Sequence, residues 1–324
     1  MHYDVFNGDA DGICALIQLR LDQPIKSTLI TGIKRDIQLL DKVSANAGDR
    51  LTVLDISLDK NNRRVEEFLN AGAAIFYVDH HQPGNIPEHP NFTALIDTDN
   101  SICTSLLVNR HLNGKFPLWA VTAAFGDNLN HSAEKLAYSL SLAGAKVETL
   151  KNLGVYINYN GYGSCIADLH FAPDVLFLEM VSFESPFDFV SENHGTFEKL
   201  ENGYHQDMGN AENLKPEYES KAVAVFLLPD TTWARRVNGV YGNHLANLNP
   251  DKAHAVVSYK PEGGYLVSVR APKNRSTGAD EFCSGFATGG GRKSAAGINH
   301  LPEDQLNLLI DKFDSFYANR TGYN

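Results

Sequence analysis

The strongest constraint on the fold is an alternation of short apolar runs with amphipathic runs across the first 160 residues. The predicted strands cover residues 3–6, 27–31, 51–54 and 74–78, and the predicted helices between them cover residues 13–21, 37–43 and 61–71. Strands that alternate with helices form a mostly parallel sheet covered on both faces. We therefore predict an α/β N-terminal domain over residues 1–160, built on such a sheet.

Polar side chains follow three of the predicted strands at the point where each strand ends. Asp9 and Asp11 follow the first strand, Asp55 follows the third, and Asp79-His80-His81 follow the fourth. In open α/β sheets, ligands bind outside the carboxyl ends of the strands. The three clusters are therefore expected to converge at one edge of the sheet.

These residue types suit a metal centre. Asp9 and Asp11 repel each other unless a cation or a shared proton offsets the charge, although a solvated turn would also explain an Asp-rich stretch. Asp127 interrupts a helical stretch over residues 101–155. Together with Asp55 and His80 it completes a set of four carboxylates and one imidazole, which suits Mn²⁺ or Mg²⁺. Two such ions about 3.5–4 Å apart would activate a nucleophile and neutralise a phosphate.

The rest of the chain is predicted to hold a connector and a second domain. Residues 161–220 mix glycine, asparagine, aromatic and acidic residues and are expected to be a helical or irregular connector. Residues 221–324 are expected to form a smaller α/β domain, with strands at 222–228, 253–258 and 265–270 and helices at 232–245 and 303–317.

A glycine-rich loop is predicted in this second domain, at Gly289-Gly290-Gly291 followed by Arg292-Lys293-Ser294. Three glycines let backbone amides approach an anion, and the following side chains add charge and hydrogen bonds. In isolation the same stretch also fits a flexible turn with two solvated cations. With Arg270 at a strand end, we favour recognition of a phosphate or a base.

The motifs resemble those of the DHH phosphoesterase family. The four matching elements are Asp9-x-Asp11-Gly, Asp55 after an apolar strand, the Asp79-His80-His81 triplet and Gly126-Asp127. In the second domain, Ser268-Val269-Arg270 and the stretch from Gly289 to Gly297 resemble the DHH-associated domain, DHHA1. The likeness covers both ends of the chain and leaves the middle unmatched.

The resemblance implies an enzyme that hydrolyses phosphodiester or phosphoanhydride bonds with two Mn²⁺ ions, or with Mg²⁺. It implies that Asp55 bridges the ions, that Asp9 binds one, and that Asp11, His80 and Asp127 bind the other. Asp79 would orient the metal ligands without binding metal itself. His81 would contact the scissile phosphate or assist the leaving group.

Two positions depart from the family pattern. Many members carry a histidine four residues before the first aspartate, where this chain has Val5. One ion should therefore have fewer protein ligands, with Asn7 or water in place of the missing one. Arg292 stands where many DHHA1 loops have histidine, and its fork of donors suits a phosphate or a guanine edge.

The net charge, the cysteine spacing and the apolar runs of the chain further limit its possible functions. The 324-residue chain has a formal net charge of −11, from 28 Lys and Arg against 39 Asp and Glu, which argues against binding of long nucleic acid. Its four cysteines are far apart and read as reduced thiols rather than as a disulfide framework. We find no signal peptide and no apolar run of about 18 residues, so we expect a soluble, cytoplasmic protein without a membrane partner.

The substrate that fits these observations is a linear dinucleotide or very short oligonucleotide, cleaved to nucleoside 5′-monophosphates. Arg292 favours pGpG among the dinucleotides. A 5′-3′ exonuclease of RecJ type and a non-catalytic nucleotide-binding regulator are the alternatives. The sequence leaves a homodimer and the role of residues 161–220 open.

Overall fold

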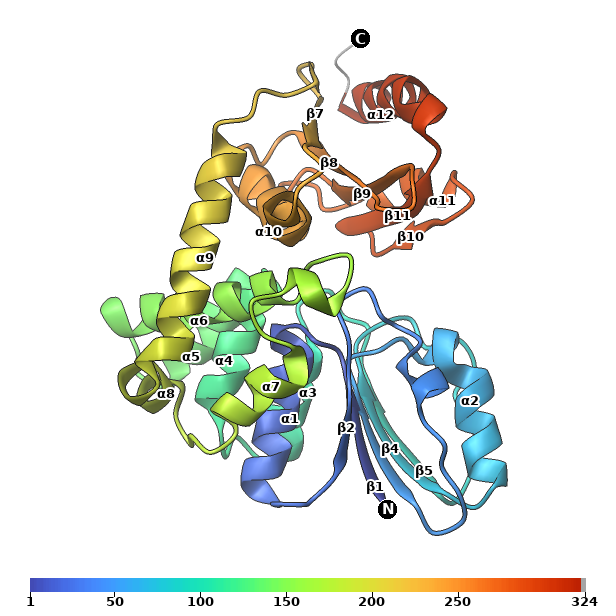
Figure 1. The fold of residues 1–324 in the computed structure, drawn as a ribbon, viewed down its shortest axis with the longest axis vertical. Helices are drawn as coiled ribbons and strands as arrows, with labels where there is room; N and C mark the ends of the chain where they lie inside the picture. Colours follow the sequence, from blue (N-terminus) through green and yellow to red (C-terminus); the bar gives the residue numbers. More distant parts are fainter. Residues whose placement is uncertain (322–324) are drawn as a thin grey trace. The chain divides into compact units, whose positions relative to one another are not determined.

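The computed structural model describes residues 1–321, and the chain divides into two compact units with the boundary between Asn202 and Gly203 (Figure 1). This division differs from the expected one, because residues 161–202 fold with the first unit rather than as a separate connector. Two contacts illustrate why: the Phe6 and Phe177 rings lie 5.7 Å apart, and the Trp119 indole donates to the Phe183 carbonyl. The buried apolar side chains of this segment complete the core of the first unit.

The first unit is built on a five-stranded parallel sheet, as predicted. Its strand order is β2-β1-β3-β4-β5. The strands are β1 (His2–Phe6), β2 (Thr28–Ile30), β3 (Arg50–Leu54), β4 (Ala74–Asp79) and β5 (Phe92–Ile96). Strand β5 was not predicted; it lies at the sheet edge, and none of its residues is fully buried.

Helices cover both faces of this sheet, with α2 on one face and α1 and α3 on the other (Figure 1). The helical segments of the unit are α1 (Ala10–Asp22), η1 (Leu39–Lys42), α2 (Leu58–Asn70), α3 (Thr104–His111), α4 (Pro117–Gly126), α5 (Asn130–Ser139), α6 (Ala145–Asn160), η2 (Ile166–Asp168), α7 (Pro173–Met180) and α8 (Pro186–Glu192). Helix α9 (His194–Glu212) runs across the boundary between the units. The face under α2 is filled by a cluster that includes Val65, Phe68 and Leu69.

Helices α4 and α6 pack unusually closely. A Cβ atom on Gly154 of α6 would lie 2.0 Å from the Thr122 carbonyl oxygen, and one on Gly126 would lie 2.5 Å from the Ala10 side chain. Only glycine permits this approach of backbone to backbone. The close packing places the end of α4 against the start of α1.

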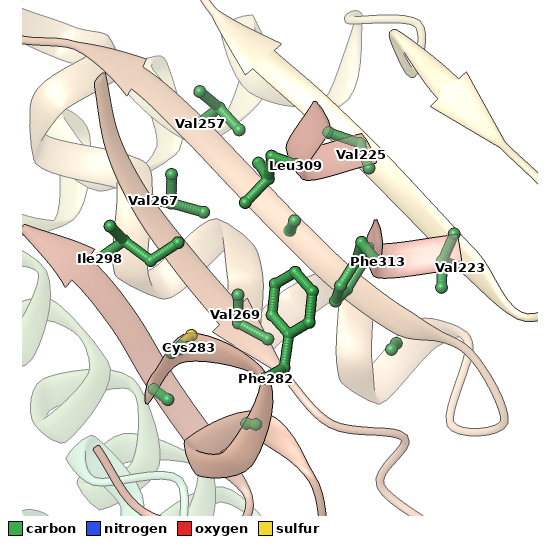
Figure 2. Packing of buried hydrophobic residues seen from close by; sticks show 14 of the residues in the cluster. Val223, Val225, Val257, Val267, Val269, Phe282, Cys283, Ile298, Leu309 and Phe313 are labelled. Carbon is green, nitrogen blue, oxygen red and sulfur yellow. The ribbon is translucent and has the colours of Figure 1, made fainter. Parts of the chain in front are cut away.

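The second unit contains a six-stranded mixed sheet of order β10-β11-β9-β8-β7-β6. Its elements are β6 (Tyr218–Glu219), β7 (Val223–Leu228), α10 (Thr232–Leu248), β8 (Ala253–Tyr259), β9 (Tyr265–Arg270), α11 (Ala279–Ser284), β10 (Gly289–Gly291), β11 (Ala295–Leu301), η3 (Glu303–Gln305) and α12 (Leu306–Thr321). Only β7 and β8 pair in parallel. Phe282 of α11 and Leu309 and Phe313 of α12 pack on the valines of the sheet (Figure 2).

The three glycines predicted as a loop form the edge strand β10. Gly289 pairs with Ile298, and Gly291 pairs with Ala296. Two of the glycines are required by packing or backbone conformation, because a Cβ on Gly289 would lie 1.7 Å from the Cys283 carbonyl oxygen and Gly291 has φ +147°. The turn is confined to Arg292-Lys293-Ser294, where the Arg292 N–H donates to the Ala295 carbonyl.

The structure bears on the predictions about the cysteines and about membrane-spanning helices. Cys14, Cys103, Cys165 and Cys283 are all free thiols, as expected. Within residues 1–321, no helix combines the length and the apolarity that crossing a membrane would require.

Candidate metal centre

The polar residues predicted to converge do meet at the carboxyl edge of the parallel sheet. Asp9 precedes α1, Asp55 follows β3, Asp79 ends β4, and Asp127 follows α4. We use the name carboxylate cluster for Asp9, Asp11, Asp55 and Asp127. The first three of these are at most 2% exposed, so water screens their mutual repulsion poorly.

Asp9 caps the first turn of α1. Its Oδ1 accepts hydrogen bonds from the backbone N–H groups of Asp11 and Gly12, at 2.9 and 3.0 Å. Gly12 is needed there, because a Cβ atom would lie 2.3 Å from the Asn7 carbonyl oxygen. The turn that opens the helix therefore also fixes the direction of the Asp9 carboxylate.

Asp11 points at the N-terminus of α3. Its two oxygens accept from the backbone N–H groups of Thr104 and Ser105, each at 2.7 Å. The positive end of a helix stabilises a carboxylate. Burial and the charges of Asp127 and Asp9 nevertheless raise the pKa of Asp11 to about 6.

Asp55 lies in the middle of the cluster in a rarely used backbone conformation, with φ +57°. Its Oδ1 accepts from the Thr104 hydroxyl at 3.1 Å and lies 3.4 Å from His80 Nε2. Burial, followed by the charges of Asp11 and the other aspartates, raises the pKa of Asp55 well above its usual value. Strained backbone and destabilised charge at one residue are typical of a functional position.

A hydrogen bond at Nδ1 orients the ring of each of the two histidines, His80 and His81. His80 Nδ1 lies 2.8 Å from the Ile102 carbonyl oxygen, which can only accept, so Nδ1 carries the proton and Nε2 presents a lone pair. That Nε2 lies 4.0 Å from Asp11 Oδ2. His81 Nδ1 lies 2.7 Å from Asp79 Oδ1, which also accepts from the His80 backbone N–H. Asp79 therefore fixes the segment that carries both imidazoles.

The donor set fits a divalent cation. Ligand atoms of Asp55, His80 and His81 all lie within 4.8 Å of one another. Donors bound to one ion at roughly 2.0–2.6 Å lie at most about 5 Å apart, so this spacing needs only small movements. A cation would also relieve the repulsion that raises the pKa of Asp55 and Asp11. The other carboxylates, Asp9 and Asp127, complete the predicted set of metal ligands.

Lys34 is a member of the site that the sequence analysis missed. Its Nζ lies 2.5 Å from Asp9 Oδ2, 3.7 Å from Asp127 Oδ1 and 2.9 Å from Asn158 Oδ1. Burial alone would raise the pKa of Asp9, but Lys34 outweighs it, and the pKa is lowered. Lys34 follows β2, so the strand-end rule that found the aspartates would also have found it.

The residues predicted to bind substrate lie in the second unit. Arg270 is held by α10, because its guanidinium donates to Asn243 Oδ1 at 2.6 Å and to the Gly239 carbonyl at 3.2 Å. Through these contacts Arg270 links β9 to α10. In the β10–β11 turn, Lys293 is exposed and Arg292 is half-buried. Binding of substrate by Arg270, Gly289-Gly290-Gly291, Arg292, Lys293 and Ser294 stays a prediction.

Known proteins show similarity in structure only. No family model and no curated protein sequence matches the chain. Among solved structures, an exonuclease RecJ bound to manganese has a TM-score of 0.63 and 15% identity, over 98% of this chain and 90% of that one. RecJ in complex with Mn²⁺ from Thermus thermophilus has a TM-score of 0.63 and 17% identity, over 98% of this chain and 52% of that one.

A third structure of similar fold is the pGpG-specific phosphodiesterase PggH from Vibrio cholerae. Its TM-score is 0.59 and its identity 14%, over 98% of this chain and 100% of that one. This chain spans about half of the Thermus RecJ chain and the whole of PggH. The chain therefore has the fold of the DHH phosphoesterases, the family that its sequence motifs resemble.

Proposed function

We propose that the protein is a metal-dependent phosphodiesterase that hydrolyses linear dinucleotides or very short oligonucleotides to nucleoside 5′-monophosphates. The observation that carries the proposal is the buried carboxylate cluster with His80 at the carboxyl edge of the sheet. Buried like charges persist in a protein when a cation offsets them or chemistry requires them. The fold, shared with a nuclease and a dinucleotide phosphodiesterase, supports a phosphate ester as the substrate.

The expected cofactor is Mn²⁺, with Mg²⁺ as a substitute. Asp9, Asp11, Asp55, His80 and Asp127 would hold the expected pair of ions, which supply a hydroxide nucleophile and neutralise the phosphate when bound. The chain's own contribution is orientation. The contacts of Asp11 with α3 and of Asp79 with His81 fix these side chains before substrate arrives, and His81 is the candidate for contact with the scissile phosphate or leaving group.

A short substrate is favoured over a long strand. The net charge of −11 opposes the tracking of a polyanion, and the chain matches PggH over that protein's whole length. PggH is a pGpG-specific enzyme, and Arg292 of this chain suits a guanine edge. Linear pGpG is therefore the first substrate to test.

The test is an activity screen of the purified protein with Mn²⁺ against all linear dinucleotides. Trinucleotides, cyclic dinucleotides and a long single strand serve as comparators. We expect linear dinucleotides to be cleaved fastest, with pGpG among the best. Degradation of the long strand at an equal or higher rate would overturn the short-substrate proposal and favour a RecJ-type exonuclease.

A non-catalytic regulator is the second candidate, favoured by the ion pair between Lys34 and Asp9, which offsets part of the charge without metal. It predicts binding of a short nucleotide with no turnover of any substrate in the screen. The variant His80→Ala separates the two functions. If the protein is an enzyme, this variant should lose turnover while its far-UV circular dichroism spectrum stays unchanged. If the protein is a regulator, the wild type already has no turnover.

A further inference from the structure

The two sides of the carboxylate cluster have different positive partners. On one side, Asp55 faces His80, with Nε2 3.4 Å from Oδ1. On the other side, Asp9 faces the ammonium group of Lys34 at 2.5 Å. A lysine ammonium is a compact point charge, so it can stand where a metal ion would stand next to a carboxylate.

Lys34 is built into this place. Its backbone N–H donates to the Gly161 carbonyl at 2.8 Å, and its carbonyl accepts from Asn7 Nδ2 at 3.1 Å. Its ammonium group also contacts Asn158 Oδ1 and lies 5.4 Å from the centre of the Tyr162 ring. The side chain is only 21% exposed. Four contacts from two segments, Asn7 and residues 158–162, therefore hold this lysine against the cluster.

One position of the family pattern, Val5, offers no ligand in this chain. Val5 of β1 is fully buried among apolar neighbours and pairs in register with Ile30 and Val53. It offers no donor atom where a histidine is common in the family. Asn7, expected to fill in, donates its amide nitrogen to the Lys34 carbonyl, and its buried Oδ1 accepts no hydrogen bond from the residues that the structure describes. The chain thus lacks a histidine of the family pattern and holds a fixed cation beside Asp9.

The opposite side keeps a full donor set. Asp55, His80 and His81 present ligand atoms within 4.8 Å of one another, and Asp11 Oδ2 lies 4.0 Å from His80 Nε2. Lys34 forms its ion pairs with the other two carboxylates, Asp9 and Asp127. A divalent ion can therefore bind on the side of His80 without displacing the lysine.

We propose that the Lys34 ammonium group takes the cation position beside Asp9, so that the centre binds a single divalent ion on the side of Asp11, Asp55 and His80. The lysine then supplies a positive charge at a fixed place in the cluster. This inference rests on the proposed function only in taking the cluster as a metal centre. It changes the expected number of ions from two to one.

The test is the stoichiometry of Mn²⁺ binding, measured by calorimetric titration and by elemental analysis of the dialysed protein. We expect one ion per wild-type chain and two per Lys34→Met chain, because methionine removes the charge and keeps the length. Electron paramagnetic resonance provides the second readout. The wild type should show the pattern of an isolated Mn²⁺ ion, and Lys34→Met should show a pair coupled by exchange.

Lys42→Met is the matched control. Lys42 lies on the same segment after β2, is 51% exposed and pairs with Asp36 at 3.3 Å, so its loss should leave the stoichiometry at one ion. Lys34→Arg keeps the charge and should also bind one ion. A second ion in the Lys42→Met or Lys34→Arg protein would contradict a specific role of the Lys34 charge.

The outcomes separate the inference from the proposed function. A coupled pair of ions in the wild type would overturn the inference and leave the phosphodiesterase proposal intact. No Mn²⁺ binding by the wild type would overturn both. If Lys34→Met does not fold, the wild-type stoichiometry and spectrum still decide between one ion and two.

Discussion

A buried acid in the first unit and a buried histidine in the second have pKa values that are shifted in opposite directions. The first unit buries a carboxylate cluster, and burial with mutual repulsion raises the pKa of Asp11 to about 6. The second unit buries His254 in strand β8, where burial, followed by the charge of Lys252, lowers its pKa to about 4. Repulsion among the buried carboxylates is relieved by a cation, whereas the buried histidine needs none. Buried polarity therefore marks a chemical centre in one unit and a tolerated core residue in the other.

The largest expected effect comes from removing the central charge of the first unit. Asp55→Asn should lower turnover more than about 100-fold, beyond what loss of a supporting residue costs. It should also raise the melting temperature of the metal-free protein, because it removes repulsion and because asparagine tolerates the positive φ of this position. Kinetic assays and thermal unfolding check the two halves. A metal-free variant less stable than wild type would show that the cluster is not under electrostatic strain.

The second unit should respond instead to packing. Gly289→Ala should destabilise it by more than about 3 kcal/mol, above the usual range for overpacking, because the new Cβ atom meets the Cys283 carbonyl. Gly290→Ala is the control, since its Cβ atom would meet nothing within 4 Å. Denaturant unfolding followed by hydrogen exchange in β8 and β9 measures the effect. Equal stability of the two variants would contradict the close packing of Gly289 against Cys283.

Acid should shift the stability of the two units in opposite directions. His254 binds a proton in the unfolded chain below pH 6.5 but in the folded unit only below about pH 4. The second unit should therefore lose about 3 kcal/mol as pH falls from 6.5 to 4. Asp11 has a folded pKa raised to about 6, so its contribution to the metal-free first unit is present at low pH and is lost as pH rises from about 4 through 6.

Hydrogen exchange at pH 4.5 and 6.5, read separately in the two sheets, checks both signs. His254→Gln should flatten the response of the second unit and leave that of the first unchanged. Parallel shifts of the two units would show that burial of these two groups does not set their pH dependence.

The smallest effect is expected at Arg292, in the β10–β11 turn. Arg292→Ala should raise KM for a linear dinucleotide about tenfold, equivalent to about 1.4 kcal/mol, because one charged hydrogen-bonding partner is lost. Arg292→Lys should recover only part of this, since lysine lacks the planar fork. Steady-state kinetics with all other conditions fixed measures both. An unchanged KM would remove Arg292 from the predicted substrate-binding residues.

The sequence predicted the parallel sheet and the place of the acids because both depend on local patterns. A strand end followed by Asp55 or Asp79 is visible in a few residues, and the topology of parallel strands then brings the ends together. Lys34 obeys the same rule but was overlooked, because a lone lysine after a short, half-exposed strand looks like a solvated surface residue. Its partners Asp9 and Asn158 come from distant segments.

Other features depended on tertiary context. Three consecutive glycines indicate a loop, yet residues 289–291 form a strand that pairs with β11, and Gly289 lies so close to α11 that a side chain has no room. The end of the first unit was also not visible in sequence, because α7 and α8 are short helices that begin at Pro173 and Pro186. Only their packing on the core shows which unit they join.

The close crossing of α4 and α6 has a consequence for the interpretation of natural variants. Asp127 owes its position to the end of α4, and α4 keeps that position only while residue 154 has no side chain. A substitution at Gly154 would therefore act on the candidate metal centre, although the residue carries no chemistry and lies on a different helix. A survey of inactivating variants should count Gly154 with the ligands rather than with the scaffold.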